Sequence, residues 1–282
     1  MIVKLLFGII WLAAAPLLGG LLAGVDRKVT ARMQSRFGPP VLQPFYDVFK
    51  LLGKTPSAVN AWLVLCSYLT LMSSALAVFL FFFQADLLLI FFVLTIGAVF
   101  QVMGALSVAS PFSQVGAQRE LLQMLAYEPL IIITFVGIAL KTGSFSIESV
   151  YALDTPLLYS MPLLFVALCV ALTIKLRKSP FDISASHHGH QGIVRGVLTE
   201  YTGPQLAMLE IAHWLDVVLI LGICALFWAT SWLGMMVLLV ITYFIEMLVD
   251  NITSRMTWQW MLKRVLAPSL VLCIINLLWL AL

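Results

Sequence analysis

"LLLIFFVLTIGAVFQVMGALSVA" occupies residues 87–109 and contains no charged side chain. An α-helix needs about 20 apolar residues to cross the roughly 30 Å hydrocarbon core of a bilayer, whereas a membrane β-strand needs about ten and alternates in polarity. A segment in lipid must also satisfy its own backbone hydrogen bonds, as a helix does. The stretch therefore predicts a transmembrane α-helix.

Seven more apolar runs of this kind lie along the chain, at residues 2–24, 60–83, 120–140, 157–176, 204–229, 231–249 and 265–282. Of the 282 residues, 62% are hydrophobic and 10% are charged, and the mean hydropathy is +1.06. Soluble domains carry about 25% charged residues, so this composition excludes a soluble fold. We expect an all-α integral membrane protein with eight transmembrane helices, forming a single polytopic domain over residues 1–282.

The basic residues predict the orientation of these helices, because cytoplasmic loops are enriched in Lys and Arg. With eight spans, all but Lys4 and Lys141 of the 16 basic residues fall on one side of the membrane. That side is predicted to be cytoplasmic and holds two polar loops, residues 25–58 and 177–203. Both termini are predicted to lie outside, and the protein to be a multi-pass component of the cytoplasmic membrane.

The loop at residues 25–58 contains an amphipathic segment that follows Pro39-Pro40. Its apolar residues recur at helical spacing, opposite a polar stripe formed by Gln43, Asp47, Lys50 and Lys54; the apolar set is Val41, Phe45, Val48, Phe49 and Leu52. Such a helix is too polar to span and is typical of the membrane interface. It serves either as an anchor that fixes the topology or as a docking platform at the rim of a cavity.

The loop at residues 177–203 holds three of the four histidines, His187, His188 and His190. A zinc site would need further ligands at suitable spacing, and no Cys or second His pair lies nearby, which disfavours metal binding. Two interpretations stay open. The loop packs against a soluble subunit, or it responds to protons, because imidazole titrates near pH 6.5.

The four cysteines lie singly in different apolar runs, without a C-x-x-C pair: Cys66, Cys169, Cys224 and Cys273. Iron–sulfur clusters need grouped thiolates, so we expect small core residues, and no cofactor, metal or redox centre bound by this chain. A basic surface interleaved with aromatic residues is also absent from the sequence, so nucleic acid is not an expected partner.

Several ionisable residues fall within or at the ends of the apolar runs: Glu120, Glu128, Glu200, Glu210, His213, Asp216, Glu246 and Asp250. A carboxylate at mid-bilayer costs roughly 2.5–3.5 kcal/mol on insertion scales, and such residues often mark proton or ion routes. We expect these residues to form an ion pathway. The structural alternative is that Glu120, Asp216 and Asp250 lie at the headgroups or pair with Arg119 and Arg255.

The motifs of the polar segments are similar to those of the complex I subunit 1 family. They are D-R-K-x-x-A-R-M-Q-x-R-x-G-P (26–39), L-Q-P-x-x-D-x-x-K-L-L (42–52), S-P-F-D (179–182), V-x-G-x-x-x-E-Y-x-G (194–203) and S-R-M-T-W-Q-W-M-L-K (254–263), together with Arg119 and Tyr127-Glu128. The motifs occur in the family's order over the whole chain. The resemblance implies eight spans and an outside N-terminus.

Within that family the chain resembles the Ech-type energy-converting nickel–iron hydrogenase branch. Gly38 is followed closely by Leu42, whereas complex I members carry extra residues there. After P-F-D the chain has S-H-H-G-H-Q in place of a glutamate-rich run. One position departs from the branch pattern, because Gly192 stands where a glutamate usually follows H-x-H-Q.

The resemblance implies a membrane-anchoring and ion-coupling subunit of a ferredoxin-dependent hydrogenase complex, which links hydrogen evolution to H⁺ or Na⁺ translocation. The implied partners are the hydrogenase large and small subunits, a ferredoxin-like iron–sulfur subunit and an antiporter-like membrane subunit. The nickel–iron centre and 4Fe–4S clusters would belong to those partners, and this chain would be a non-catalytic subunit of the enzyme.

The docking and coupling surface is expected to lie on the two cytoplasmic loops, at Arg27, Arg32, Arg36, Asp47, Asp182, His187, His188, His190 and Arg195. Two other functions stay open. One is the quinone-site subunit of a complex I-like dehydrogenase. The other is a stand-alone secondary cation transporter, although no internal repeat of the kind found in transporters is visible.

Overall fold

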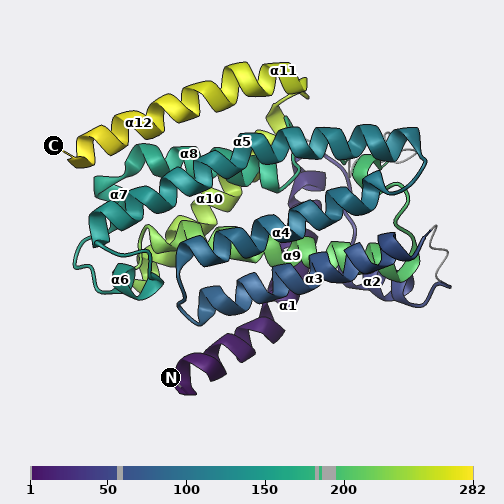
Figure 1. The fold of residues 1–282 in the computed structure, drawn as a ribbon, viewed down its shortest axis with the longest axis horizontal. Helices are drawn as coiled ribbons and strands as arrows, with labels where there is room; N and C mark the ends of the chain where they lie inside the picture. Colours follow the sequence, from purple (N-terminus) through teal and green to yellow (C-terminus); the bar gives the residue numbers. More distant parts are fainter. Residues whose placement is uncertain (1, 56–59, 182–183, 186–194, 282) are drawn as a thin grey trace.

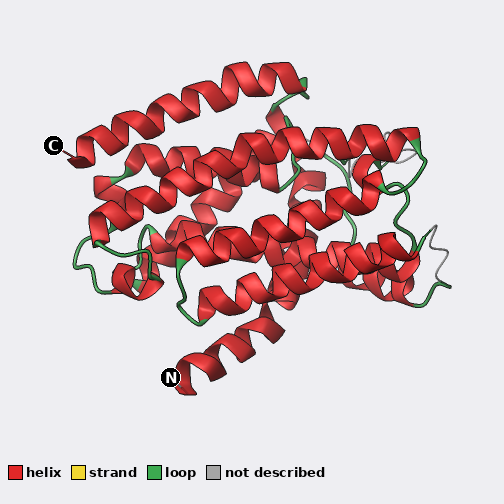
Figure 2. Cartoon of the chain, viewed as in Figure 1, coloured by secondary structure: helices red, strands yellow, loops and turns green. Residues whose placement is uncertain are grey.

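The computed structural model describes residues 2–55, 60–181, 184–185 and 195–281, and these are almost entirely helical (Figures 1 and 2). The helices are α1 (Ile2–Met33), α2 (Gln43–Leu52), α3 (Ala61–Phe82), α4 (Leu87–Leu106), α5 (Pro111–Thr142), α6 (Ile147–Tyr151), α7 (Leu157–Ser160), α8 (Pro162–Lys175), α9 (Gly203–Leu226), α10 (Trp232–Ile252), α11 (Trp258–Met261) and α12 (Ala267–Ala281). A 3-10 turn, η2 (Gly196–Leu198), precedes α9, and a π-helical turn, η3 (Leu262–Leu266), joins α11 to α12.

Seven helical segments of the described chain are long and apolar enough to cross a membrane. They are α1, α3, α4, α5, α9, α10 and the continuous segment Trp258–Leu280. The chain is therefore a multi-pass membrane protein, as the sequence predicts. The fifth predicted run, 157–176, is divided into α7 and the 14-residue α8, which is about 21 Å long. Eight crossings and the placement of the termini stay predictions.

The break between α7 and α8 is satisfied by a side chain from α12. Pro162 has no N–H group and interrupts the helix after Met161, which lies outside helical geometry at φ −132° and ψ 49°. The carboxamide oxygen of Asn276 accepts hydrogen bonds from the backbone N–H groups of Leu163 and Leu164, both at 3.0 Å. Its nitrogen donates to the Ser160 carbonyl at 3.1 Å. Fully buried Asn276 thus caps α8 inside the bundle.

The connections between the described helices lie at two opposite ends of the bundle, and contacts among residues at each end show which connections lie together. At one end Lys4 pairs with Glu148 at 2.6 Å, and the Leu158 N–H donates to the Phe227 carbonyl. At the other end Asn60 donates to the Ser107 carbonyl. Figure 1 shows both chain ends on the left of the view. Which of the two ends faces the cytoplasm stays a prediction from the basic residues.

Two helices extend beyond their predicted ends. The run predicted at 2–24 continues as α1 to Met33, and the run predicted at 120–140 begins as α5 at Pro111. The added turns carry polar residues that are adequate helix formers, and hydropathy does not detect them. Glu120 therefore lies inside α5 rather than at its start.

The amphipathic segment of the first loop forms α2, which packs on α9. The Phe45 ring meets the Trp214 ring edge to face at 5.3 Å, and Val48 is buried. Val41 precedes the helix, and Phe49 is 67% exposed, so the predicted apolar stripe is only partly buried. The backbone of Val41 lies against Gly24 of α1. A Cβ atom at residue 24 would come within 1.8 Å of the Val41 carbonyl oxygen, so residue 24 must be glycine.

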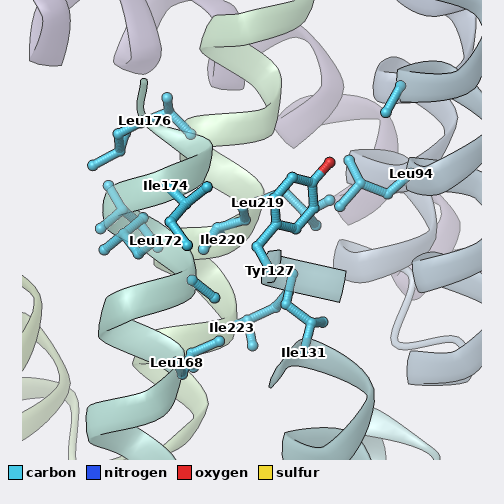
Figure 3. Close-up of a cluster of buried hydrophobic side chains, with 14 of the residues drawn as sticks. Leu94, Tyr127, Ile131, Leu168, Leu172, Ile174, Leu176, Leu219, Ile220 and Ile223 are labelled. Carbon is cyan, nitrogen blue, oxygen red and sulfur yellow. The ribbon is translucent and has the colours of Figure 1, made fainter. Parts of the chain in front are cut away.

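The core of the bundle is formed around α9, the most deeply buried of the spanning helices. Figure 3 shows side chains of α5, α8 and α9 meeting in one cluster, which includes Tyr127, Ile131, Leu168, Leu172, Ile220 and Ile223. In contrast, α1, α10 and the C-terminal segment have the smallest shares of buried residues among the spanning helices. The outer faces of these helices suit lipid or neighbouring membrane subunits.

Candidate functional site

Three basic side chains at the end of α8 are buried in the bundle. We call Lys175, Arg177 and Lys178 the basic hub; their side chains are only 9%, 10% and 9% exposed. The helix ends here because Arg177 adopts a left-handed conformation, with φ of 54°. This turn directs successive cations toward different helices. A helix C-terminus also favours positive charge through its dipole.

Two of the hub cations form ion pairs with helices on different sides of α8. The Lys175 ammonium lies 3.0 Å from Asp216 of α9, and its nitrogen lies 5.3 Å from the centroid of the Tyr127 ring of α5. The Lys178 ammonium lies 2.9 Å from Asp26 of α1. The short segment after α8 therefore links α1, α5 and α9 electrostatically.

The third hub cation, Arg177, joins α5 to α4. Its guanidinium lies 2.9 Å from Glu120 and donates to the side-chain oxygen of Gln101 at 3.1 Å. Burial acts to lower the pKa of the Arg177 guanidinium, but the Glu120 carboxylate outweighs this effect and raises that pKa above its ordinary value, so Arg177 stays charged. The Tyr201 hydroxyl donates to the Gln101 carbonyl at 3.0 Å, which brings the start of α9 to the same place.

Backbone contacts extend the hub to α10. The N–H group of Ser179 donates to Asp250 at 2.8 Å, and the Ser179 hydroxyl donates to the Thr253 carbonyl at 2.9 Å. Removing one partner of a buried ion pair typically costs about 3–5 kcal/mol, because the other charge is left uncompensated. A change of charge at the hub therefore affects contacts with α1, α5, α9 and α10.

The structure gives buried counter-charges for two of the outer acids. Glu120 pairs with Arg177, and Asp216 pairs with Lys175, two partners that the sequence interpretation did not name. In the sequence, Lys175, Arg177 and Lys178 serve only as topology markers. The sequence does contain a signal for the buried ion pairs. Acids within apolar runs need buried counter-charges, and the basic segment K-L-R-K (175–178) stands at the end of an apolar run.

Four of the predicted pathway acids keep an oxygen atom that can accept a further hydrogen bond. Glu120, Glu128, Asp216 and Glu246 each have one buried oxygen without a hydrogen-bond donor in the part of the chain that the structure describes. Buried polar atoms nearly always bind a partner, often ordered water. These acids thus have the capacity to take up a proton or to bind water.

Glu128 and Glu246 differ from the hub acids, because neither forms an ion pair with a residue of the described chain. Glu246 is only 2% exposed and lies beside Thr173 of α8. Glu128 lies beside Thr95 of α4 and follows Tyr127, whose ring contacts Lys175. The hub is thus flanked by one additional acid on α5 and another on α10.

The acids of the sixth predicted span are not arranged as one uniform row. Glu210 of α9 lies 3.5 Å from Arg195, and His213 follows one turn later on the same helix. Glu200 lies in the turn before α9, half-buried and outside the helix. Arg195, which is also predicted to lie at the docking surface, contacts a predicted pathway acid.

The predicted docking residues of the first loop are mostly exposed and partly pair with one another. Arg27 and Asp47 form an ion pair at 3.0 Å, which fastens α2 to the end of α1. The Arg32 guanidinium lies 5.4 Å from the centroid of the Phe37 ring, and Arg36 donates to Gln34. The docking residues of the second loop, Asp182, His187, His188 and His190, lie outside the described residues.

In the described part of the chain, no group of three or more His, Cys, Asp or Glu side chains is placed to hold a metal ion. The four cysteines are free thiols. The chemistry that the hub residues themselves offer is that of charged and protonatable groups in ion pairs between helices.

Comparison with known proteins gives relatives in two kinds of redox complex. Hydrogenase-4 component C of Escherichia coli is 32% identical over 67% of this chain and 64% of its own length, so this chain spans less than two thirds of that relative. Formate hydrogenlyase subunit 4 of the same organism is 30% identical over 73% of this chain and 70% of its own. A subunit of the NADH-quinone oxidoreductase of Rubrobacter xylanophilus is 29% identical over 73% and 69%.

A solved structure has the same fold. In the membrane-bound sulfane sulfur reductase, an archaeal respiratory membrane complex, one chain superposes with a TM-score of 0.86, covering 98% of this chain and 99% of that one at 23% identity. The sequence profile described as NADH dehydrogenase matches residues 5–281. This chain therefore belongs to the NADH dehydrogenase subunit 1 family of membrane proteins.

Proposed function

We propose that this chain is the membrane-anchoring and ion-coupling subunit of a ferredoxin-dependent, energy-converting nickel–iron hydrogenase complex. The observation that carries the proposal is the basic hub, where Lys175, Arg177 and Lys178 connect acids of α1, α5 and α9 beside the loops expected to dock a soluble module. The similarity to hydrogenase-4 component C and formate hydrogenlyase subunit 4 supports the hydrogenase assignment over other redox complexes.

The hub has a simple means of coupling charge movement to helix position. A proton that reaches Glu120 or Asp216 neutralises the carboxylate and weakens its ion pair with Arg177 or Lys175. The released cation then favours ionisation of a neighbouring acid, because an uncompensated buried charge is costly. Glu128, Glu246 and Glu210 are the nearby acids proposed to continue the path, together with Glu200, His213 and Asp250.

The proposed partners follow from the same assignment. They are hydrogenase large and small subunits, a ferredoxin-like iron–sulfur subunit and an antiporter-like membrane subunit. The nickel–iron centre and the 4Fe–4S clusters are proposed to lie in those subunits. The translocated ion is proposed to be H⁺ or Na⁺, moved across the cytoplasmic membrane.

Metal analysis of the complex tests this assignment. The native complex is purified in mild detergent through an affinity tag on this chain, and its nickel content and ferredoxin-driven hydrogen evolution are measured. The proposal expects nickel near one equivalent per chain, with hydrogen evolution. An intact complex without nickel would contradict it.

A second candidate function is the quinone-site subunit of a complex I-like dehydrogenase. The similarity to the NADH-quinone oxidoreductase of Rubrobacter xylanophilus favours it. The same preparation discriminates between the two, because quinone reduction by a nickel-free complex is expected only of the dehydrogenase.

A further inference from the structure

A surface cavity of about 250 Å³ lies at the start of the C-terminal segment, and none of its lining residues belongs to the basic hub. Its lining residues are Gln259, Trp260, Lys263 and Arg264. Figure 1 shows α11 and α12 as one yellow rod along the outer edge of the bundle. The cavity thus opens beside a helix that faces the membrane.

Local structure places two cations at this cavity. The Thr257 hydroxyl accepts a hydrogen bond from the Trp260 N–H and starts α11. The π-helical turn η3 follows, and Pro268 explains it in part, since proline has no N–H to donate to the Arg264 carbonyl. The Arg264 guanidinium then lies 5.0 Å from the centroid of the Trp260 ring. Lys263 and Arg264 are both exposed.

The cavity is positively charged. Neither Lys263 nor Arg264 forms an ion pair with an acid among the described residues, and the lining contains no carboxylate. This distinguishes the two from the hub cations, which have buried acidic partners. A ligand with one or two negative charges would neutralise the cavity, while the tryptophan ring would cover an apolar part of that ligand.

The surface beyond the cavity is apolar. Val271, Ile274, Ile275 and Leu278 of α12 are 48–60% exposed and recur at helical spacing, so they form one stripe. The stripe starts about two helical turns after the cations. A molecule with a negative head and a hydrocarbon tail matches both surfaces at once.

We propose that the cavity formed by Gln259, Trp260, Lys263 and Arg264 binds the phosphate headgroup of an anionic phospholipid, with acyl chains along the exposed face of α12. Basic pockets at the ends of transmembrane helices bind anionic headgroups in this way, and tryptophan prefers the same depth in the membrane.

Lipid at this cavity would stabilise the connection between α10 and α11. That connection contacts the segment after the hub, because the Met256 N–H donates to the Pro180 carbonyl at 3.0 Å. Met261 of α11 is buried in the core. Anionic lipid is therefore expected to raise the melting temperature of the chain, which non-specific association with its surface would not do.

Native mass spectrometry tests the site on the full-length chain in detergent, titrated with phosphatidylglycerol or phosphatidylcholine. The Lys263→Gln/Arg264→Gln double variant is expected to bind phosphatidylglycerol about 30-fold more weakly, since each surface cation contributes roughly fivefold to such affinity. The matched control is Lys50→Gln, an exposed cation at the end of α2 on the same predicted side. It is expected to bind as the wild type does.

The remaining outcomes show whether the cavity binds a phospholipid headgroup, free phosphate or another protein subunit. Equal binding of phosphatidylglycerol by wild type and double variant would overturn the proposal. Full displacement of the lipid by millimolar inorganic phosphate would also overturn it, because the site would then recognise free phosphate alone. If the double variant keeps its lipid but loses a protein subunit of the complex, the cavity is a protein contact and the lipid site is refuted.

A measurement on the wild type alone covers the case in which the double variant does not fold. Melting of the wild-type chain is followed in detergent with phosphatidylglycerol and with phosphatidylcholine. The proposal expects a higher melting temperature with the anionic lipid, and a Trp260→Leu variant is expected to lose part of that increase. No difference between the two lipids would refute it.

Discussion

The Arg177 guanidinium lies 2.9 Å from the Glu120 carboxylate, and both side chains are at most 10% exposed. Glu120 is on α5, and Arg177 lies 57 positions further on, beyond α8. Each charge would be costly to bury alone, so each requires the other. Because the two residues belong to different elements, their pair also fixes how α5 and α8 lie together.

Replacing Arg177 by Met is expected to destabilise the protein by about 3–5 kcal/mol, because Glu120 is left buried without its cation. In a chain of this size the melting temperature should fall on the order of 10 °C. The Arg177→Met/Glu120→Gln double variant should recover much of the loss, since both charges are removed. Thermal melting of the three proteins in one detergent measures this, and additive losses would show that the two side chains do not interact.

Replacing Asn276 by Leu should cost about 1–3 kcal/mol, because the N–H groups of Leu163 and Leu164 lose their acceptor. Ile275→Leu is the control, since this neighbouring side chain of α12 is 48% exposed and the variant should melt with the wild type. Thermal melting distinguishes the two variants. If the Leu variant melts with the wild type, α8 does not need a cap from α12.

Charge reversal at Arg36 is expected to release the soluble redox module while this chain stays in the membrane. Arg36 is exposed on the first loop, where the proposed module docks. Pull-down of the complex from Arg36→Glu membranes measures retention of the module. Lys141→Glu, exposed at the other end of the bundle, is the control. Full retention of the module in Arg36→Glu would remove Arg36 from the docking surface.

Cysteine labelling is expected to confirm the orientation. Ser35 and Ser144 are exposed at opposite ends of the bundle, and the basic residues place Ser35 in the cytoplasm. A membrane-impermeant thiol reagent added to intact cells should label Ser144→Cys and leave Ser35→Cys unmodified. The reverse pattern would invert the assigned orientation.

The sequence predicts the spanning helices well, because a run such as residues 87–109 carries its own signal of length and hydropathy. It predicts the fifth span less well. Whether Pro162 ends a helix or starts one depends on Asn276, which lies more than a hundred positions away. No local pattern indicates that such a distant side chain caps α8.

The candidate site is predicted only in part. Acids in apolar runs are conspicuous, so Glu120, Asp216 and Glu246 are identified from the sequence alone. Their partners are not, because Lys175 and Arg177 follow an apolar run and look like ordinary cytoplasmic charges. Packing around the left-handed turn at Arg177 draws these cations into the bundle, and this is a tertiary effect.

Ion uptake into membrane vesicles, driven by reduced ferredoxin, tests most directly whether this chain couples electron transfer to ion movement. The variant is Glu210→Gln, which keeps the shape of the side chain beside Arg195 but cannot ionise. Glu148→Gln, exposed at the opposite end of the bundle, is the control. Glu210→Gln is expected to assemble and to evolve hydrogen with an artificial electron donor, yet to lose most ferredoxin-driven ion uptake. Undiminished uptake in Glu210→Gln would contradict the coupling role.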